Sequence, residues 1–202
     1  MKLDESKTGY ESTTLPWRPI MPAMTISIEQ LLQRVVDTGP DRYAAAAAML
    51  ADEGIEDLYP GGCELSGPEP FDKGIPTLRR NVYRSPTPMV AARFAFAGRW
   101  MDAETAWLGI ADMEAVLGNE EVLEHIDSHR QHWTGSAPAL FPPDRLTLFG
   151  VVEEEWENQT YLVWPDRDGE EPSVWVYCGH SEHKHENLAK YLEWLLEDSS
   201  QE

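Results

Sequence analysis

The feature that most constrains the fold is a set of three segments in the last third of the chain that are rich in β-branched and aromatic residues. They span residues 146–152, 160–164 and 173–178. Such compositions are typical of β-strands. Residues 165–169, Pro-Asp-Arg-Asp-Gly, form a turn sequence between the second and third segments. The sequence therefore predicts an antiparallel sheet that includes a hairpin.

Helical spacing dominates the residues before these segments and returns after them. Ser27 is the expected N-cap of a first helix that Gly39-Pro40 ends, and an alanine-rich second helix is expected over residues 41–53. Further helices are expected over residues 102–117, 119–133 and 185–197. The predicted fold class is therefore α+β, with a helical N-terminal part followed by an antiparallel sheet closed by a C-terminal helix.

Proline and glycine mark the expected boundaries. Residues 1–24 are polar and then proline-rich, which indicates an extended arm. The remaining residues, 25–202, are expected to form a single α+β domain. Residues 54–76 are rich in glycine and proline, and they are the best position for an internal boundary.

The net charge of −20 excludes several partners. Nucleic-acid binding needs clustered Lys and Arg, so nucleic acid is not expected as a partner, and anionic membranes are disfavoured for the same reason. A basic protein would be attracted to such a surface, although solubility explains acidity equally well. The chain has no apolar signal core, no stretch long enough to span a bilayer and only two cysteines, so a cytoplasmic location is expected.

The acidic excess is concentrated near the end of the chain, where residues 151–202 hold 14 acidic and 3 basic residues. The densest groups lie in the connections between the predicted strands. One interpretation is a single acidic contact surface formed by two loops, and the other is solvated loops that protect the sheet from aggregation. The candidate partner-binding residues are Glu153, Glu154, Glu155, Glu157, Asp166, Asp168, Glu170 and Glu171.

Residues 73–101 have the opposite composition, with six basic residues and no acidic residue. They are expected either to dock on the acidic sheet within the chain or to form a second interaction face. The basic residues are Lys73, Arg79, Arg80, Arg84, Arg93 and Arg99.

Sequence patterns for catalysis are missing. There is no Gly-x-Ser-x-Gly elbow, and the helical stripe of His125, His129 and His132 lacks the glutamate of a His-Glu-x-x-His site. A second group of potential ligands matches no known zinc spacing, so only adventitious nickel or zinc binding is expected there. That group is Cys178, His180, His183 and His185. We expect a non-catalytic protein without metal or cofactor; a small hydrolase with an unrecognised site is the remaining enzymatic hypothesis.

Four segments of the last third resemble the C-terminal half of the SUKH superfamily, which includes fungal cell-wall regulators and many bacterial immunity proteins. The resemblance covers about residues 119–197. It depends on a strand that ends in Phe-Gly (143–150), an aromatic strand that ends in Trp (160–164), a Glu-Pro-x-x-Trp strand (171–177) and a closing helix (187–192).

The resemblance implies a non-catalytic α+β fold. Bacterial members often neutralise a polymorphic toxin, frequently a nuclease, so it also implies an immunity-type protein that binds a basic toxin domain through its acidic surface. The alternative is a regulatory or scaffold adaptor that binds a partner protein through the helical residues 1–118. The oligomeric state does not follow from the sequence.

Overall fold

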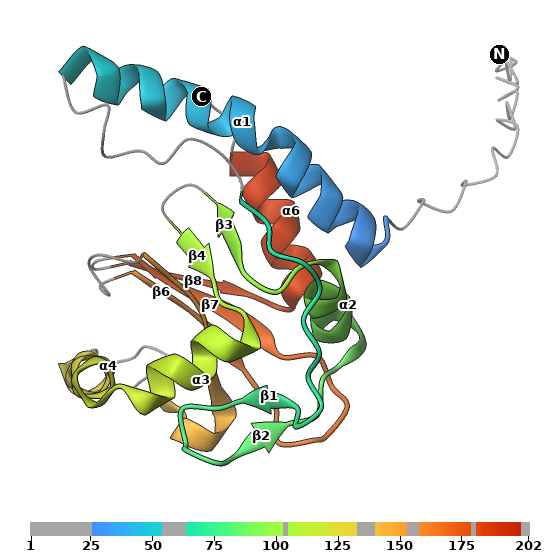
Figure 1. Ribbon diagram of the computed structural model, residues 1–202, viewed down its shortest axis with the longest axis vertical. Coiled ribbons are helices and arrows are strands. Elements are labelled where there is room, and N and C mark those ends of the chain that lie inside the picture. Colours follow the sequence, from blue (N-terminus) through green and yellow to red (C-terminus); the bar gives the residue numbers. More distant parts are fainter. Residues whose placement is uncertain are drawn as a thin grey trace, which may run out of the picture.

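The computed structural model describes residues 26–53, 64–102, 105–132, 140–152, 158–178 and 181–198. Its centre is a six-stranded sheet in which every neighbouring pair is antiparallel and the strand order follows the chain, from β3 to β8 (Figure 1). The strands are β3 (Trp100–Asp102), β4 (Thr105–Trp107), β5 (Leu146–Val152), β6 (Gln159–Val163), β7 (Ser173–Cys178) and β8 (Ser181–His185).

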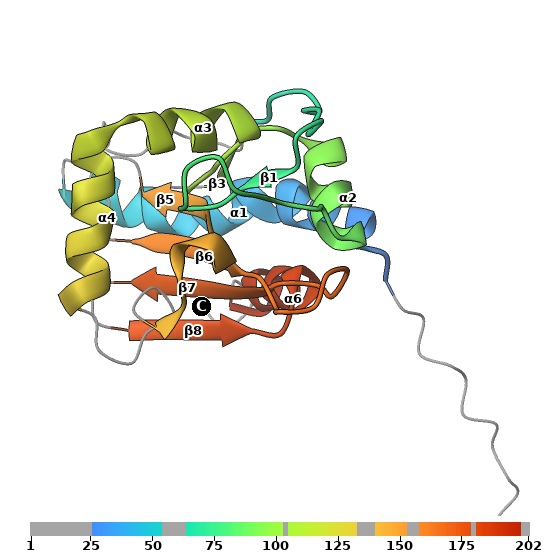
Figure 2. The ribbon, with the colours of Figure 1, turned by 90° about the horizontal axis from the view of Figure 1, so that it is seen from below.

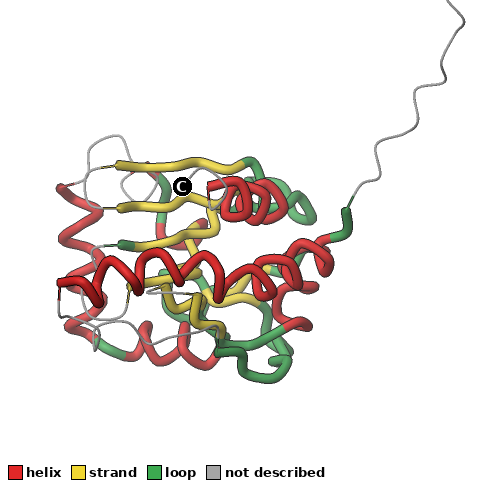
Figure 3. The backbone as a smooth tube through the Cα atoms, turned by 90° about the horizontal axis from the view of Figure 1, so that it is seen from above, coloured by secondary structure: helices red, strands yellow, loops and turns green. Residues whose placement is uncertain are grey.

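One face of the sheet is covered by the helices α1 (Ile28–Glu53), α2 (Pro88–Phe96) and α6 (Leu188–Asp198). Figure 3 shows α1 and α6 in front of the strands on this face. The buried side chains of α1 are at helical spacing, with Leu31, Leu32 and Val35 at most 2% exposed. Since α1 contacts both α2 and α6, the first and the last helix of the described residues hold each other.

The other face carries α3 (Ile110–Gly118), α4 (Glu120–His132), the short hairpin of β1 (Ile75–Pro76) and β2 (Tyr83–Arg84), and the turn of 3-10 helix η2 (Pro143–Arg145). Figure 2 shows α4 crossing the end of the sheet at which β5 ends and β6 begins. Helices therefore lie on both sides of the sheet, and the C-terminal helix follows it. The predicted α+β class is confirmed.

An aromatic cluster joins the sheet to α6. The ring centroid of Trp107 lies 4.5 Å from that of Trp100, 5.3 Å from that of Phe149 and 5.4 Å from that of Tyr191. All four side chains are at most 3% exposed. Because Trp100 and Trp107 are paired across β3 and β4, this two-strand unit belongs to the same core as the C-terminal strands.

Arg93 of α2 is fully buried beside this cluster. Its guanidinium donates hydrogen bonds to the backbone carbonyls of Ala97, Gly98 (2.6 Å) and Trp107 (3.3 Å). Burial lowers the pKa of Arg93 to about 9, while the charges of Glu69 and Asp112 raise it. The side chain is therefore charged at neutral pH and ties the end of α2 to the end of β4.

The expected break at Gly39-Pro40 is wrong, because α1 runs unbroken from Ile28 to Glu53 with Pro40 inside it. A proline inside a helix removes one backbone hydrogen bond and costs about 3 kcal/mol. The alanine-rich segment after Pro40 favours helix, and the first turns are held by packing on α6. Tertiary contacts thus override the local helix-breaking signal.

The expected helix over residues 102–117 is half wrong, because Asp102 is the last residue of β3, Thr105–Trp107 form β4, and only α3 is helical. The expected last helix begins at Leu188 instead of His185, since residues 181–185 form β8. The strands β5, β6 and β7 and the helix α4 are confirmed. Asn119 caps α4 as expected, because its Oδ1 accepts a hydrogen bond from the Glu121 N–H (3.1 Å).

The predicted arm, residues 1–24, lies outside the described residues, as do residues 54–63 of the proposed boundary segment. Of the rest of that segment, residues 64–66 lie along β3: Leu65 bridges to Trp100, and the Ser66 N–H donates to the Arg99 carbonyl (2.9 Å). Further on, the Glu69 N–H donates to the Phe94 carbonyl of α2 (3.1 Å). Elements before and after residues 54–76 therefore contact one another directly.

Candidate functional site

The β6–β7 connection contains four of the candidate acidic residues, and it is less acidic in the fold than in the sequence. Asp166 forms an ion pair with Arg145 (2.9 Å), and Glu170 lies 3.6 Å from Arg167. The side chains of Asp166 and Glu170 are both exposed to solvent. Among the described residues of this turn, Asp168 is the carboxylate that remains exposed without an ion pair.

Glu171 is turned towards α2 and serves the fold. Its carboxylate accepts hydrogen bonds from the Thr87 hydroxyl (2.5 Å) and from the Met89 backbone N–H (2.9 Å). Thr87 is the N-cap residue of α2 but makes no side-chain cap itself. The positive end of a helix stabilises a carboxylate, so Glu171 supplies the cap from a distant part of the chain.

Glu153, Glu154, Glu155 and Glu157 lie outside the described residues. Their flanking residues are described: the Val152 N–H donates to the Asn158 carbonyl (3.1 Å), where β5 ends and β6 begins. The β6–β7 connection leaves β6 at its other end. The two acidic connections are therefore attached at opposite ends of β6, and the described residues do not bring them together.

The acidic surface that the structure adds is on α4. Glu120, Glu121 and Glu124 are exposed, and none of these carboxylates forms an ion pair with a described residue. Further along the helix, Asp127 pairs with Arg130 (3.0 Å). The sequence signal for this surface is three glutamates within five residues directly after a helix N-cap.

This surface lies at the end of the sheet where β6 begins (Figure 2). Arg130 donates a hydrogen bond to the Phe141 carbonyl (3.2 Å), which holds α4 against the segment before β5. Nearby, Tyr161 of β6 donates its hydroxyl proton to Gln159 Oε1 (2.5 Å), and burial raises the pKa of Tyr161. The surface of α4 thus faces outward at the same end to which residues 153–157 are attached.

The basic residues of the segment 73–101 mostly bind within the chain. Arg80 and Arg84 donate hydrogen bonds to the carbonyls of Leu117 and Asp144, each at 2.9 Å. Arg99 lies 3.6 Å from Asp112, and Arg93 is buried in the core. Most of these cations therefore bind within the chain, but their described partners lie on α3, η2 and the end of β4 and not on the acidic connections between the strands. Docking on the acidic sheet, one of the two roles expected for this segment, is not what these contacts form.

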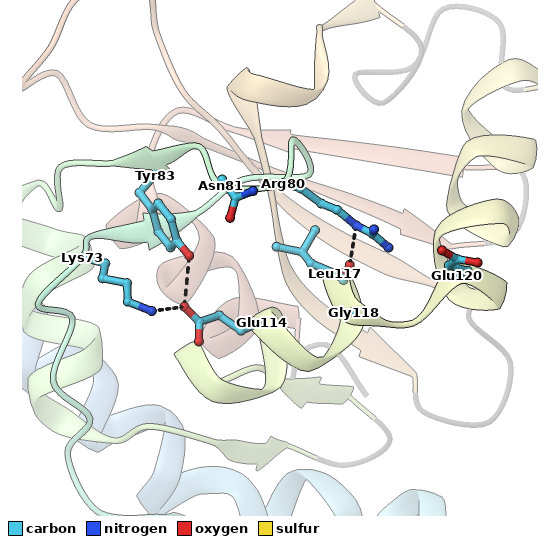
Figure 4. A pocket seen from close by; sticks show the side chains of 8 residues that line it. All are labelled: Lys73, Arg80, Asn81, Tyr83, Glu114, Leu117, Gly118 and Glu120. Atoms are coloured by element: carbon cyan, nitrogen blue, oxygen red, sulfur yellow. Dashed lines mark hydrogen bonds and ion pairs between the residues drawn. The ribbon is translucent and has the colours of Figure 1, made fainter.

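A surface pocket of about 430 Å³ lies between the β1–β2 hairpin and α3 (Figure 4). On one side of the pocket, the carboxylate of Glu114 lies 3.2 Å from the Tyr83 hydroxyl and 3.6 Å from Lys73 Nζ. Because the carboxylate is already engaged by a hydroxyl and an ammonium group, it is poorly placed to act as a general base. The pocket is lined by Lys73, Arg80, Asn81, Tyr83, Glu114, Leu117, Gly118 and Glu120.

Four histidines have described side chains, and they lie in two separate pairs; the side chain of His132, the third residue of the predicted stripe, lies outside the described part. His125 and His129 have ring centroids 4.2 Å apart on α4, whereas His183 and His185 of β8 pack on Trp194 of α6, at 5.5 Å and 5.0 Å. The side chains of Cys178 and His180 lie outside the described part. Within that part, no three His, Cys, Asp or Glu side chains are placed to hold a metal ion.

None of the described helices is both long and apolar enough to cross a membrane. In comparisons with known proteins, no family model, no curated protein and no solved structure matches this chain.

Proposed function

We propose that this protein is a non-catalytic, cytoplasmic protein-binding module of the immunity type, which neutralises a cognate bacterial toxin through an acidic surface. The observation that carries the proposal is that several basic side chains are engaged within the chain, whereas a group of acidic side chains is not. Basic side chains such as Arg80, Arg84 and Arg93 bind backbone carbonyls within the chain, whereas the carboxylates of Glu120, Glu121 and Glu124 face outward without ion pairs to described residues.

A basic toxin domain fits this distribution. A nuclease binds phosphate groups with clustered Lys and Arg, and an acidic protein presents the same sign of charge as the nucleic acid. Complementary surface charge raises the association rate and selects against like-charged partners. A net charge of −20 therefore favours fast capture of a basic protein.

Membership of the SUKH superfamily is part of the same proposal. The segments that carry the resemblance form the strands β5, β6 and β7 and the closing helix α6, with the additional strand β8 between β7 and α6. Their arrangement as an antiparallel sheet followed by a helix supports the resemblance. A binding role without catalysis is also supported by the surface pocket, where Glu114 is bound to Tyr83 and Lys73.

The experiment is a growth-rescue assay in cells that express the product of the adjacent gene, together with a binding titration of the two purified proteins. We expect co-expression to restore growth. We expect the triple variant E120K/E121K/E124K to weaken binding about tenfold or more, mainly through a slower association rate, because exposed charges act chiefly on that rate.

The matched control is D166K/D168K/E170K in the β6–β7 turn, which also reverses three charges, two of them already paired with Arg145 and Arg167. We expect this variant to bind with a smaller loss than the α4 variant. Absence of rescue by the wild-type chain contradicts the proposal. Equal binding by wild type and by both charge-reversed variants contradicts the acidic surface.

An adaptor that binds through the N-terminal helices is the second candidate, and one observation favours it. The second half of α1 carries exposed positions at Asp41, Ala44, Ala48 and Ala51. Small side chains at helical spacing permit close approach of another helix. The variant A44E/A48E would abolish such binding and leave toxin rescue unchanged.

A further inference from the structure

The two edges of the central sheet differ in how they are protected. The outer edge of β3 is covered by residues 64–66, since the Met101 N–H donates to the Glu64 carbonyl (2.9 Å) and Leu65 bridges to Trp100. No strand in the described part of the chain pairs with the outer edge of β8. Four of the five residues of β8 are exposed and the fifth is half-buried.

An open edge of this kind offers unpaired backbone N–H and C=O groups to another strand. We propose that β8 pairs with β8 of a second copy of this chain, antiparallel and centred on His183, to form a two-fold symmetric dimer with one continuous sheet. This inference does not depend on the proposed function.

The pairing of β7 with β8 fixes which side chains share a face. Glu182 is opposite Tyr177 and Lys184 is opposite Trp175, so both charged side chains lie on the face of these aromatic residues. Lys184 Nζ lies 5.1 Å from the Trp175 ring centroid. His183 lies on the opposite face, stacked on α6. Glu182 and Lys184 are therefore two residues apart and point to the same side.

This spacing makes β8 complementary to itself. In an antiparallel pair that is centred on His183, Glu182 of each copy lies directly opposite Lys184 of the other. Directly opposed residues have Cβ atoms about 4.5–5.5 Å apart, and opposite charges in these positions stabilise the pair. The contact is isologous, because the same strand is used by both copies, and it closes without leaving an open edge.

Neighbouring symmetric registers are disfavoured by the same two side chains. A pair centred on Glu182 places two glutamates opposite each other, and a pair centred on Lys184 places two lysines opposite each other. Like charges in directly opposed positions are destabilising. Charges on an edge strand commonly prevent uncontrolled association. Here Glu182 and Lys184 disfavour pairing with other strands and in the neighbouring registers, but they favour pairing with a second β8 centred on His183.

The net charge of −20 on each copy opposes association. The contact itself is balanced, because β8 carries one acidic and one basic side chain. Repulsion between the remaining charges is largely screened beyond about 8 Å at 0.15 M ionic strength. Sedimentation velocity or light scattering of the full chain at this ionic strength should therefore give a species of twice 22.9 kDa that dissociates on dilution.

The decisive test uses complementary variants. E182K and K184E each place like charges opposite each other in the homodimer, so each variant alone should be a monomer at concentrations where the wild type is a dimer. An equimolar mixture should form a heterodimer, because one strand then carries two positive charges and the other two negative charges. The double variant E182K/K184E should be a dimer again.

Matched controls carry the same charge changes at exposed positions on other elements, D72K and R79E, and should remain dimers. Circular dichroism of each variant checks that the fold is retained. A monomeric wild type at about 100 µM, dimers that persist in E182K and K184E, or single variants that fail to associate on mixing would each overturn the proposal.

Discussion

The carboxylate of Glu171 closes the N-terminus of α2 across a large separation in sequence. It accepts hydrogen bonds from the Thr87 hydroxyl and the Met89 N–H, in a helix whose own N-cap side chain makes no cap bond. Its neighbour Glu170 is exposed and pairs only with Arg167 on the surface. Two adjacent glutamates of one acidic turn therefore have different roles.

Replacement of these two residues should separate the roles. E171A should lower the free energy of unfolding by about 1–2 kcal/mol, the usual value of an N-cap carboxylate. E170A should change it by less than about 0.5 kcal/mol, because an exposed ion pair contributes little. Urea unfolding of both variants measures the difference; equal values would show that Glu171 is not a cap in solution.

The inward contacts of single residues are the part of the candidate site that sequence could not predict. Residues 73–101 contain several arginines, but the sequence does not distinguish the buried Arg93 from the exposed Arg79. The difference arises because the end of α2 and the end of β4 bring free carbonyls of Gly98 and Trp107 to one point. The same reason applies to Glu171, whose partner is more than eighty residues away.

At the scale of elements, a segment is predictable from sequence when its residues themselves prefer a helix or a strand. A segment that takes its structure from tertiary contacts is not predictable in this way. β-Branched and aromatic residues predict β5, β6 and β7 correctly. β8, with the sequence Ser-Glu-His-Lys-His, has no such preference and is a strand because β7 pairs with it. The strand β4 is predicted as helix because Trp107 also fits helical spacing with α3. The exposed glutamates of α4 lie on a helix, so the criterion of acidic connections between strands does not include them.

The packing of α6 on β8 should make stability depend on pH. Burial, and to a lesser extent the charge of His183, lowers the pKa of His185 from its ordinary value of 6.5. The rings of Tyr191 and Trp194 from α6 face this histidine, at 5.3 Å and 5.0 Å. The unfolded chain therefore binds a proton more readily than the folded chain, and stability is lost as the pH falls below about 6.5.

The variant H185Q removes this titration. The free energy of unfolding of the wild type should fall between pH 7.5 and pH 5, and the fall should be smaller in H185Q. Urea unfolding at both pH values, at protein concentrations low enough for monomers, makes the comparison. H183Q is the companion variant, since it removes the smaller electrostatic contribution. A wild type and an H185Q that respond identically to pH would contradict this explanation.

At the scale of the whole molecule, the excess of 36 acidic over 16 basic residues acts on the compact state itself. Like charges that are brought together by folding repel one another, and salt screens that repulsion. Several carboxylates, for example Glu120, Glu121 and Glu124, are exposed without an ion pair to a described residue, so the outer surface is unevenly negative. The folded chain should therefore be more stable at moderate ionic strength than at low ionic strength.

A thermal unfolding series in sodium chloride measures this effect. Between about 0.01 M and 0.15 M salt, we expect Tm to rise by roughly 2–4 °C, the shift that about 1 kcal/mol produces in a chain of this size. The variant E120K/E121K/E124K has less negative charge and should show a smaller rise. A Tm that falls over the same range would mean that favourable ion pairs, such as Asp166 with Arg145, outweigh the net repulsion.

The contact between α1 and α6 has a consequence for how the chain is made. α1 is synthesised long before α6, and its apolar residues Leu31, Leu32 and Val35 are buried partly against that last helix. At about 5–20 residues per second, the interval between the two helices is on the order of ten seconds. During this time the apolar stripe of α1 is available to chaperones and to other nascent chains, so the first helix to emerge is the one that waits longest for its partner.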